Sequence, residues 1–164
     1  MLTALTNTTI FTGTETLKGK AVLIKDKTIE GIIDPPSIPK DTDIIDCGGN
    51  YLSPGLIDLQ IAGGGGYLFS ANPSAEALKA ITEAINASGT TGFLIVIPTN
   101  SIDVYHKVIR VVKENPHPSV LGLHIEGPYI SPLRRGAHIK EFIKSPQRDE
   151  IEALIAEAGG IVKM

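Results

Sequence analysis

The chain has 164 residues, of which 42% are hydrophobic and 20% charged, and its formal net charge is −3. These proportions describe a globular chain with an apolar interior and exclude a disordered or fibrous one. A weakly acidic chain without a run of Lys or Arg offers no electrostatic surface to nucleic acid or to an anionic membrane, so we expect a small-molecule partner. The single cysteine, Cys47, excludes an internal disulfide and a thiolate-rich metal site. The longest apolar run is too short to span a bilayer and the first residues lack a secretory signal pattern, which predicts a cytoplasmic protein.

Residues 1–53 consist of short β-branched runs separated by turn residues. Ala21 to Lys25 and Thr28 to Ile33 flank Asp26 and Lys27, which predicts a β-hairpin. The segment DPPSIPKDTD that follows is rich in proline and charge and is typical of an exposed connection.

From residue 54 onward the pattern changes to alternating strands and helices. We predict strands at 56–62, 92–99 and 119–127, and the start of another in the final residues IVKM. The first predicted helix is capped by Asn72, with Pro73 at its first position, and ends before Gly89. The second spans 102–114 with Val104, Val108, Val111 and Val112 inward, and the third begins at Ser145 and Pro146 and buries Ile151, Leu154 and Ile155.

This alternation predicts an α/β fold with a parallel sheet and right-handed crossovers. An open doubly wound sheet and a segment of a barrel both satisfy the pattern. Because the chain ends inside an apolar strand, an incomplete (β/α)8 barrel is favoured, since a whole one needs about 250 residues.

Four consecutive glycines, Gly63 to Gly66, follow the first of these strands. Such a run resembles a loop that cradles a phosphate. A phosphate cradle, however, normally opens directly into a helix, and here YLFSANPS intervenes.

Reactive side chains are densest in GLHIEGPYISPLRRGAH, residues 122–138. His124 and Glu126 share one face of the predicted strand, and Glu126 lies at its carboxyl end, where α/β folds build their sites. A carboxylate there needs a cation, which is either a metal ion or an arginine, Arg134 or Arg135, of the next loop.

HIEGPYISP followed by RRGAH, together with LSPGLIDLQIAGGGG, resembles the N-acetylglucosamine-6-phosphate deacetylase family of the amidohydrolase superfamily. The resemblance covers essentially the whole chain. It implies a small β-sandwich portion at residues 1–53 and the first β/α units of a TIM-type barrel at residues 54–164. It also implies hydrolysis of the acetamide of N-acetylglucosamine 6-phosphate to glucosamine 6-phosphate and acetate, by a homodimer when the enzyme is complete.

The resemblance also assigns roles to individual residues. Glu126 matches the glutamate that binds the family's catalytic divalent ion, usually zinc or iron. His138 matches a histidine that binds and polarises the N-acetyl carbonyl, and Ala137 and Gln60 fall with it in the substrate-binding set. His124 is interpreted as a packing or supporting residue, His106 and His117 as surface residues, and Arg134 and Arg135 as either phosphate-attracting or merely solvated.

The first barrel strand departs from the superfamily pattern. Many members place His-x-His there to hold a second metal, and a single-metal branch of the family has Gln-x-Asn, whereas this chain has Gln60 and Ala62. Alanine cannot coordinate an ion, so the resemblance implies one ion at most. No catalytic residue is assigned within the chain: the family's histidine ligands and catalytic aspartate are expected beyond Met164, and Asp58 is displaced from the position a substitute would need.

Three other interpretations stay open at this point. In the first, the chain belongs to an amidohydrolase for another N-acyl sugar or a cyclic amide. In the second, it is a non-catalytic fragment that acts as an interaction module. In the third, it is an open-sheet protein that binds phosphate at its glycines. Half a barrel leaves an unpaired edge strand and apolar surface, so we expect the isolated chain to associate or aggregate.

Overall fold

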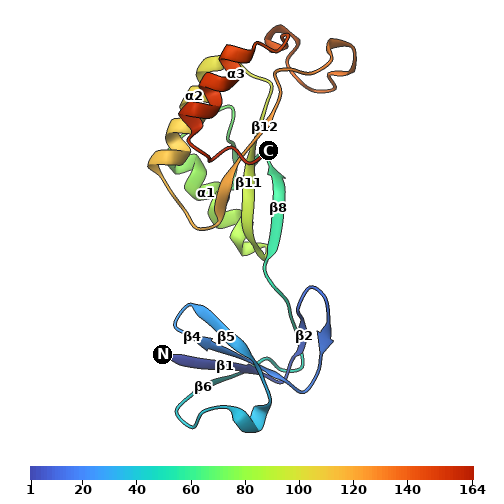
Figure 1. The fold of residues 1–164 in the computed structure, drawn as a ribbon, viewed down its shortest axis with the longest axis vertical. Coiled ribbons are helices and arrows are strands. Elements are labelled where there is room, and N and C mark those ends of the chain that lie inside the picture. Colours follow the sequence, from blue (N-terminus) through green and yellow to red (C-terminus); the bar gives the residue numbers. More distant parts are fainter. The chain divides into compact units, whose positions relative to one another are not determined.

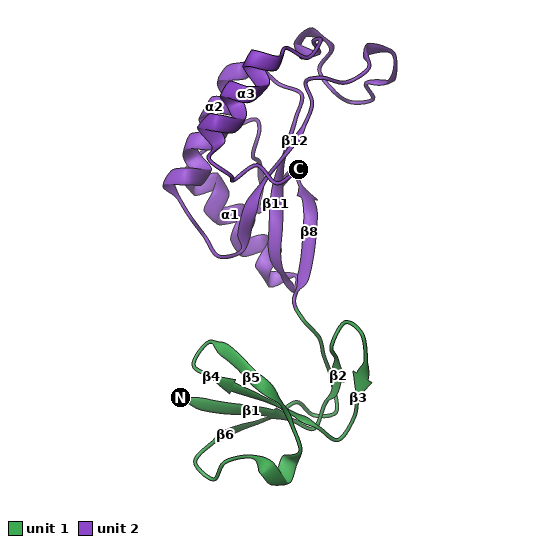
Figure 2. Ribbon diagram, in the orientation of Figure 1, with its two compact units in different colours: residues 1–54 green, residues 55–164 purple.

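The computed structural model describes all 164 residues and divides into two compact units, residues 1–54 and 55–164 (Figure 2). The first unit contains strands, turns and one short 3-10 helix, Pro35–Ser37, and the second combines parallel strands with helices. None of the helices has the length and apolar character needed to cross a bilayer.

The first unit holds two small sheets, with strand orders β5-β4-β1-β6 and β3-β2-β7. Their strands are β1 (Leu2–Thr6), β2 (Thr9–Phe11), β3 (Thr16–Leu17), β4 (Ala21–Lys25), β5 (Thr28–Ile33), β6 (Asp43–Asp46) and β7 (Tyr51–Leu52). The predicted hairpin is confirmed as the antiparallel pair β4 and β5. Its tight turn is possible because Asp26 adopts a φ of 54°, a conformation that aspartate tolerates better than most residues.

The second unit is built on three parallel strands, β8 (Leu56–Ile61), β11 (Thr90–Pro98) and β12 (Val120–Glu126). They lie in the order β12-β11-β8. The final residues extend the sheet beyond β12, because Val162 pairs with Leu123 in parallel and Ile125 N donates to Met164 O at 2.8 Å. The spatial order of the strands therefore follows the chain, without the reversal of a doubly wound sheet, and the sheet does not close into a barrel.

Three helices pack on one side of this sheet: α1 (Ala75–Ala87), α2 (Ile102–Glu114) and α3 (Arg148–Ala158) (Figure 1). The predicted bounds of α2 are confirmed. The predicted start of α1 is wrong, because Ser74 rather than Asn72 is its N-cap and accepts a hydrogen bond from Ala77 N at 3.1 Å. The predicted start of α3 at Ser145 is also too early, because the helix begins at Arg148. Lys144 N donates to Pro128 O and Lys144 Nζ donates to Glu150, and the residues between Lys144 and Arg148 lie outside the helix.

The core lies between the sheet and the helices. Phe93, Ile95 and Ile97 of β11 point into it, and α2 contributes Tyr105, Val108, Ile109 and Val112. Val104 and Val111, predicted to be inward, are only partly buried. On α3 the buried residues are Leu154 and Ala158, while Ile155 is 57% exposed. Val108, Val112 and Leu154 were predicted to be inward and are buried, so the predicted apolar faces overlap the observed ones without coinciding with them.

Candidate functional site at the carboxyl end of the sheet

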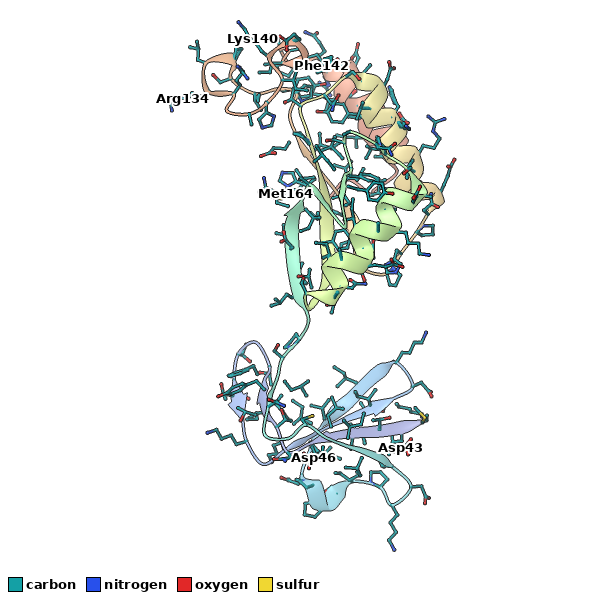
Figure 3. The ribbon with its side chains drawn as sticks, turned by 180° about the vertical axis from the view of Figure 1, so that it is seen from behind. Asp43, Asp46, Arg134, Lys140, Phe142 and Met164 are labelled. Carbon is teal, nitrogen blue, oxygen red and sulfur yellow. The ribbon has the colours of Figure 1, made fainter.

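Glu126 is the last residue of β12 and lies beside Pro98, the last residue of β11. His124 lies two residues earlier, opposite Val96. This is the edge where consecutive parallel strands end and their loops begin, so residues from different strands meet there. The loop from β12 to α3 projects beyond the same edge, and Figure 3 labels Arg134, Lys140 and Phe142 on it.

The Glu126 carboxylate has a different neighbour on each oxygen. Gln60 Nε2 on β8 donates to Oε1 at 3.2 Å, and His138 Nε2 lies 3.8 Å from Oε2. The Glu126 side chain is 38% exposed and the His138 side chain 16%. The structure thus brings together Gln60, Glu126 and His138, three of the four residues that the resemblance singled out. Ala137, the fourth, is exposed in the loop next to His138.

The arginine alternative for Glu126 is wrong. Arg135 Nη1 donates to the backbone carbonyl of His138 at 2.7 Å and so closes the loop on itself. Neither Arg134 nor Arg135 forms an ion pair with Glu126, and the basic side chain nearest to its carboxylate is the imidazole of His138. Glu126 is therefore left with a carboxylate oxygen free to accept a cation or a hydrogen bond.

The orientation of His138 follows from its contacts with Thr99. Thr99 N donates to His138 Nδ1 at 3.2 Å, and Thr99 Oγ1 lies 2.8 Å from the same nitrogen. A backbone N–H can only donate, so Nδ1 is an acceptor and the neutral ring carries its proton on Nε2, the atom facing Glu126. His138 is consequently a hydrogen-bond donor toward the site.

Thr99 is a site residue that the sequence interpretation missed. It is 1% exposed and directly follows β11. The sequence did contain a signal for it: Thr99 is a polar residue at the carboxyl end of a buried parallel strand, as Glu126 is.

The end of β8 is held by its own side chains. Asp58 Oδ1 accepts a hydrogen bond from Gln60 N at 2.8 Å, so the carboxylate of Asp58 is engaged locally and does not reach toward Glu126. Ala62 takes part in this strand end only through its carbonyl oxygen, which accepts a hydrogen bond from Phe69 N at 3.0 Å. Among residues 1–164 no group of three His, Cys, Asp or Glu side chains could hold a metal ion together.

The glycine run forms a hairpin instead of a phosphate cradle. β9 (Gly63–Gly64) pairs antiparallel with β10 (Tyr67–Leu68), and the turn between them needs a positive φ at Gly65 and Gly66. A Cβ on Gly65 would lie 2.6 Å from Ala80 O, so the turn lies against α1. The close approach that Gly65 makes possible is therefore to the backbone of a helix.

The remaining histidines have structural partners. His124 Nδ1 lies 3.0 Å from Leu59 O; since a carbonyl only accepts, His124 donates and braces β12 against β8. His106 Nδ1 lies 2.5 Å from Glu157 Oε2 and links α2 to α3. His117 Nδ1 accepts from Ser119 N at 3.1 Å, before β12 begins.

Comparison with known proteins agrees with this arrangement. The family model described as the NagA composite domain matches residues 2–52. The chain is 36% identical over 164 residues to the N-acetylglucosamine-6-phosphate deacetylase of Bos taurus and 35% identical over 162 residues to that of Haemophilus influenzae. The chain is similar in sequence to these deacetylases. The two alignments cover 92% and 97% of this chain but only 40% and 42% of the relatives, so the chain spans about two-fifths of their length.

Solved structures of the deacetylase family resemble the fold closely. The N-acetylglucosamine-6-phosphate deacetylase of Pasteurella multocida superposes with a TM-score of 0.91 at 30% identity, over 99% of this chain and 43% of that one. A variant of the Mycobacterium smegmatis enzyme, determined in complex with N-acetyl-D-glucosamine 6-phosphate, superposes with a TM-score of 0.83 at 26% identity, over 99% of this chain and 42% of that one. The family resemblance noted in the sequence is thereby confirmed.

Proposed function

We propose that residues 1–164 form the N-terminal part of a metal-dependent N-acetylglucosamine-6-phosphate deacetylase. In this proposal residues 1–53 belong to a small β-sandwich and residues 54–164 are the first β/α units of a TIM-type barrel. The chain-ordered parallel strands with helices on one side support the barrel assignment. The observation that carries the functional proposal is the meeting of Glu126 and His138 at the end of the sheet, with His138 Nε2 at 3.8 Å from Glu126 Oε2.

Glu126 fits the role of one ligand to a divalent ion. Its Oε2 has His138 Nε2 as a neighbour at 3.8 Å, which leaves it free to bind, while Gln60 orients Oε1. Carboxylate oxygen suits zinc or iron when imidazoles complete the set. Because the relatives extend well beyond the matched region, we propose that the other ligands and the general acid/base come from that additional length.

A bound ion of this kind would supply Lewis acidity to the acetamide and a water molecule activated at neutral pH. Glu126 would hold the ion, and the amide of Gln60 would keep the carboxylate in position. His138 would donate its Nε2 proton in a hydrogen bond to the acetamide oxygen, where negative charge develops as the carbonyl is attacked. Ala137, exposed beside it, would line the space for the sugar. The products are acetate and glucosamine 6-phosphate.

The direct test is release of acetate from N-acetylglucosamine 6-phosphate by a protein of the relatives' full length that contains these residues. N-acetylglucosamine without the phosphate and a cyclic amide such as hydantoin serve as competing substrates. Preferential hydrolysis of the phosphorylated sugar supports the proposal. Preferential hydrolysis of the cyclic amide would contradict it.

A second candidate substrate is favoured by one comparison. The chain is 37% identical over 87 residues to the N-acetylgalactosamine-6-phosphate deacetylase of a Shewanella species, a match covering 51% of this chain and 22% of that protein. The two sugars differ only in the configuration of one hydroxyl, so the same assay with both phosphates separates the candidates by their ratio of kcat/KM.

A further inference from the structure

Two donors of Thr99 converge on a single nitrogen of His138. Thr99 follows β11 directly and is 1% exposed, so neither donor has ready access to water. Its backbone nitrogen and its hydroxyl oxygen lie 3.2 and 2.8 Å from His138 Nδ1. A buried backbone N–H without a partner is rare in folded proteins because its desolvation is not compensated. The Thr99 amide thus depends on Nδ1 being free of a proton.

The position of the Thr99 side chain depends in turn on the residue after Glu126. A Cβ on Gly127 would lie 2.1 Å from Thr99 Oγ1, closer than real atoms approach. Only glycine at position 127 therefore leaves room for the hydroxyl beside His138. Thr99 therefore lies against the residue that follows Glu126 and against His138 itself, which makes the geometry of the Glu126–His138 pair sensitive to Thr99.

We propose that Thr99 is the positioning residue of the site: it fixes which nitrogen of His138 carries the proton and directs that N–H toward the Glu126 side. The use of this N–H in catalysis rests on the proposed function. The arrangement itself does not, and it can be measured without any activity.

His124 provides an internal reference for this measurement. Its Nδ1 faces the carbonyl oxygen of Leu59 at 3.0 Å, and a carbonyl cannot donate. At a pH where imidazoles are neutral, His124 is expected to carry its proton on Nδ1 and His138 on Nε2. The two histidines of one sheet end should thus show opposite tautomers.

The experiment is magic-angle-spinning NMR of residues 1–164 labelled with ¹⁵N, which reads histidine tautomers in monomers and in assemblies alike. We expect the ring nitrogens of His138 to give the Nε2–H pattern and the Thr99 amide to show a correlation with His138 Nδ1 across the hydrogen bond. A His138 ring protonated on Nδ1 would overturn the proposal whatever the protein catalyses.

Two substitutions sharpen the test. Thr99→Ser keeps both donors and should leave the His138 signals unchanged. Thr99→Val keeps the amide but loses the hydroxyl, and should shift His138 Nδ1 toward the value of a less hydrogen-bonded nitrogen and broaden it, with His124 unaffected. Indistinguishable His138 signals in the Ser and Val variants would refute the role of the hydroxyl. If the Val variant fails to fold, the tautomer and the cross-bond correlation of the unsubstituted chain still decide the proposal.

Discussion

The polar side chains at the end of the sheet are oriented mainly by backbone groups. The Thr99 backbone amide sets the acceptor nitrogen of His138, the Leu59 carbonyl sets the donor nitrogen of His124, and the backbone amide of Gln60 donates to the carboxylate of Asp58. Backbone groups at strand ends move little, so side chains tied to them are preorganised. This arrangement explains how a site with few charged neighbours keeps its geometry.

His138 is predicted to serve the substrate and not the metal ion. In a protein of the relatives' full length that contains these residues, His138→Ala should lower kcat by about 100- to 1,000-fold, the usual effect of losing one oxyanion donor. Bound metal, measured by elemental analysis, should stay at the level of the unsubstituted protein because Glu126 is untouched.

His117→Ala is the matched control for His138→Ala. It removes a histidine that also accepts a hydrogen bond from a backbone amide, that of Ser119, but lies before β12 and away from Glu126. This variant should keep kcat within about twofold. Loss of metal in His138→Ala would show that His138 is a ligand and that its assigned role is wrong.

At the scale of secondary structure, the glycine hairpin β9–β10 shows how backbone geometry constrains the sequence. Gly65→Ala should destabilise the fold more than Gly66→Ala. Both positions have a positive φ, which costs about 1–2 kcal/mol for alanine, but only Gly65 would also bring its Cβ against Ala80 O, while Gly66 faces open space. The further overpacking at Gly65 is expected to cost about 1–3 kcal/mol.

Urea denaturation of both variants measures this difference as a change in the free energy of unfolding. Equal destabilisation of the two variants would mean that the hairpin does not rest on α1 in solution.

The cap of α1 gives a second test at this scale. Ser74→Ala should lower the free energy of unfolding by about 1 kcal/mol, because Ser74 Oγ accepts the hydrogen bond of Ala77 N. Ser101→Ala is the matched control, since Ser101 caps α2 without a side-chain hydrogen bond, and should change stability by a few tenths of that amount. A larger effect at Ser101 would contradict the assigned caps.

The secondary structure was largely predictable from periodicity and turn residues. The hairpin of β4 and β5 and the bounds of α2 follow directly from their sequence patterns. The start of α1 was predicted wrongly because Asn72, Pro73 and Ser74 each carry a helix-start signal, and the sequence pattern does not show that Ser74 is the cap. The buried face of α2 includes Tyr105, although the sequence predicted a stripe of valines there. Burial raises the pKa of the Tyr105 hydroxyl to about 12.

The site was predictable only as far as residue type and strand position allow. Glu126 could be singled out as a carboxylate at a strand end, and His138 and Gln60 through the family resemblance. The position of Thr99 at a strand end could be read from the sequence, but its role depends on a contact with His138 across 39 residues, and no local pattern encodes such a contact. The same holds for His124, whose partner Leu59 lies on another strand.

At the scale of the whole molecule, the open sheet predicts association. β8 pairs only with β11, and Leu56, Ile57 and Leu59 on it are 62%, 64% and 50% exposed. An unpaired edge with apolar side chains favours pairing with another chain. Sedimentation velocity of residues 1–164 should therefore show species larger than a monomer, in a concentration-dependent way.

A lysine on that edge should reduce the association. Ile57→Lys is expected to shift the distribution toward the monomer, because charge on an edge strand opposes pairing. Leu133→Lys is the control, since Leu133 is 96% exposed but lies in the loop after β12, and should leave the distribution unchanged. A single monomeric species for the unsubstituted chain at all concentrations would contradict the prediction.

We propose above that this chain supplies Glu126 as a metal ligand to a deacetylase. The most direct measurement is the metal content and the deacetylation of N-acetylglucosamine 6-phosphate by the Glu126→Gln variant of a protein of the relatives' full length that contains these residues. Glutamine keeps the size of the side chain and its contact with Gln60 but removes the charge. We predict that bound metal and kcat/KM fall together, each by at least the roughly 10- to 100-fold that weaker perturbations of metal sites cause. Retention of one full equivalent of metal with undiminished activity would show that Glu126 is not a metal ligand.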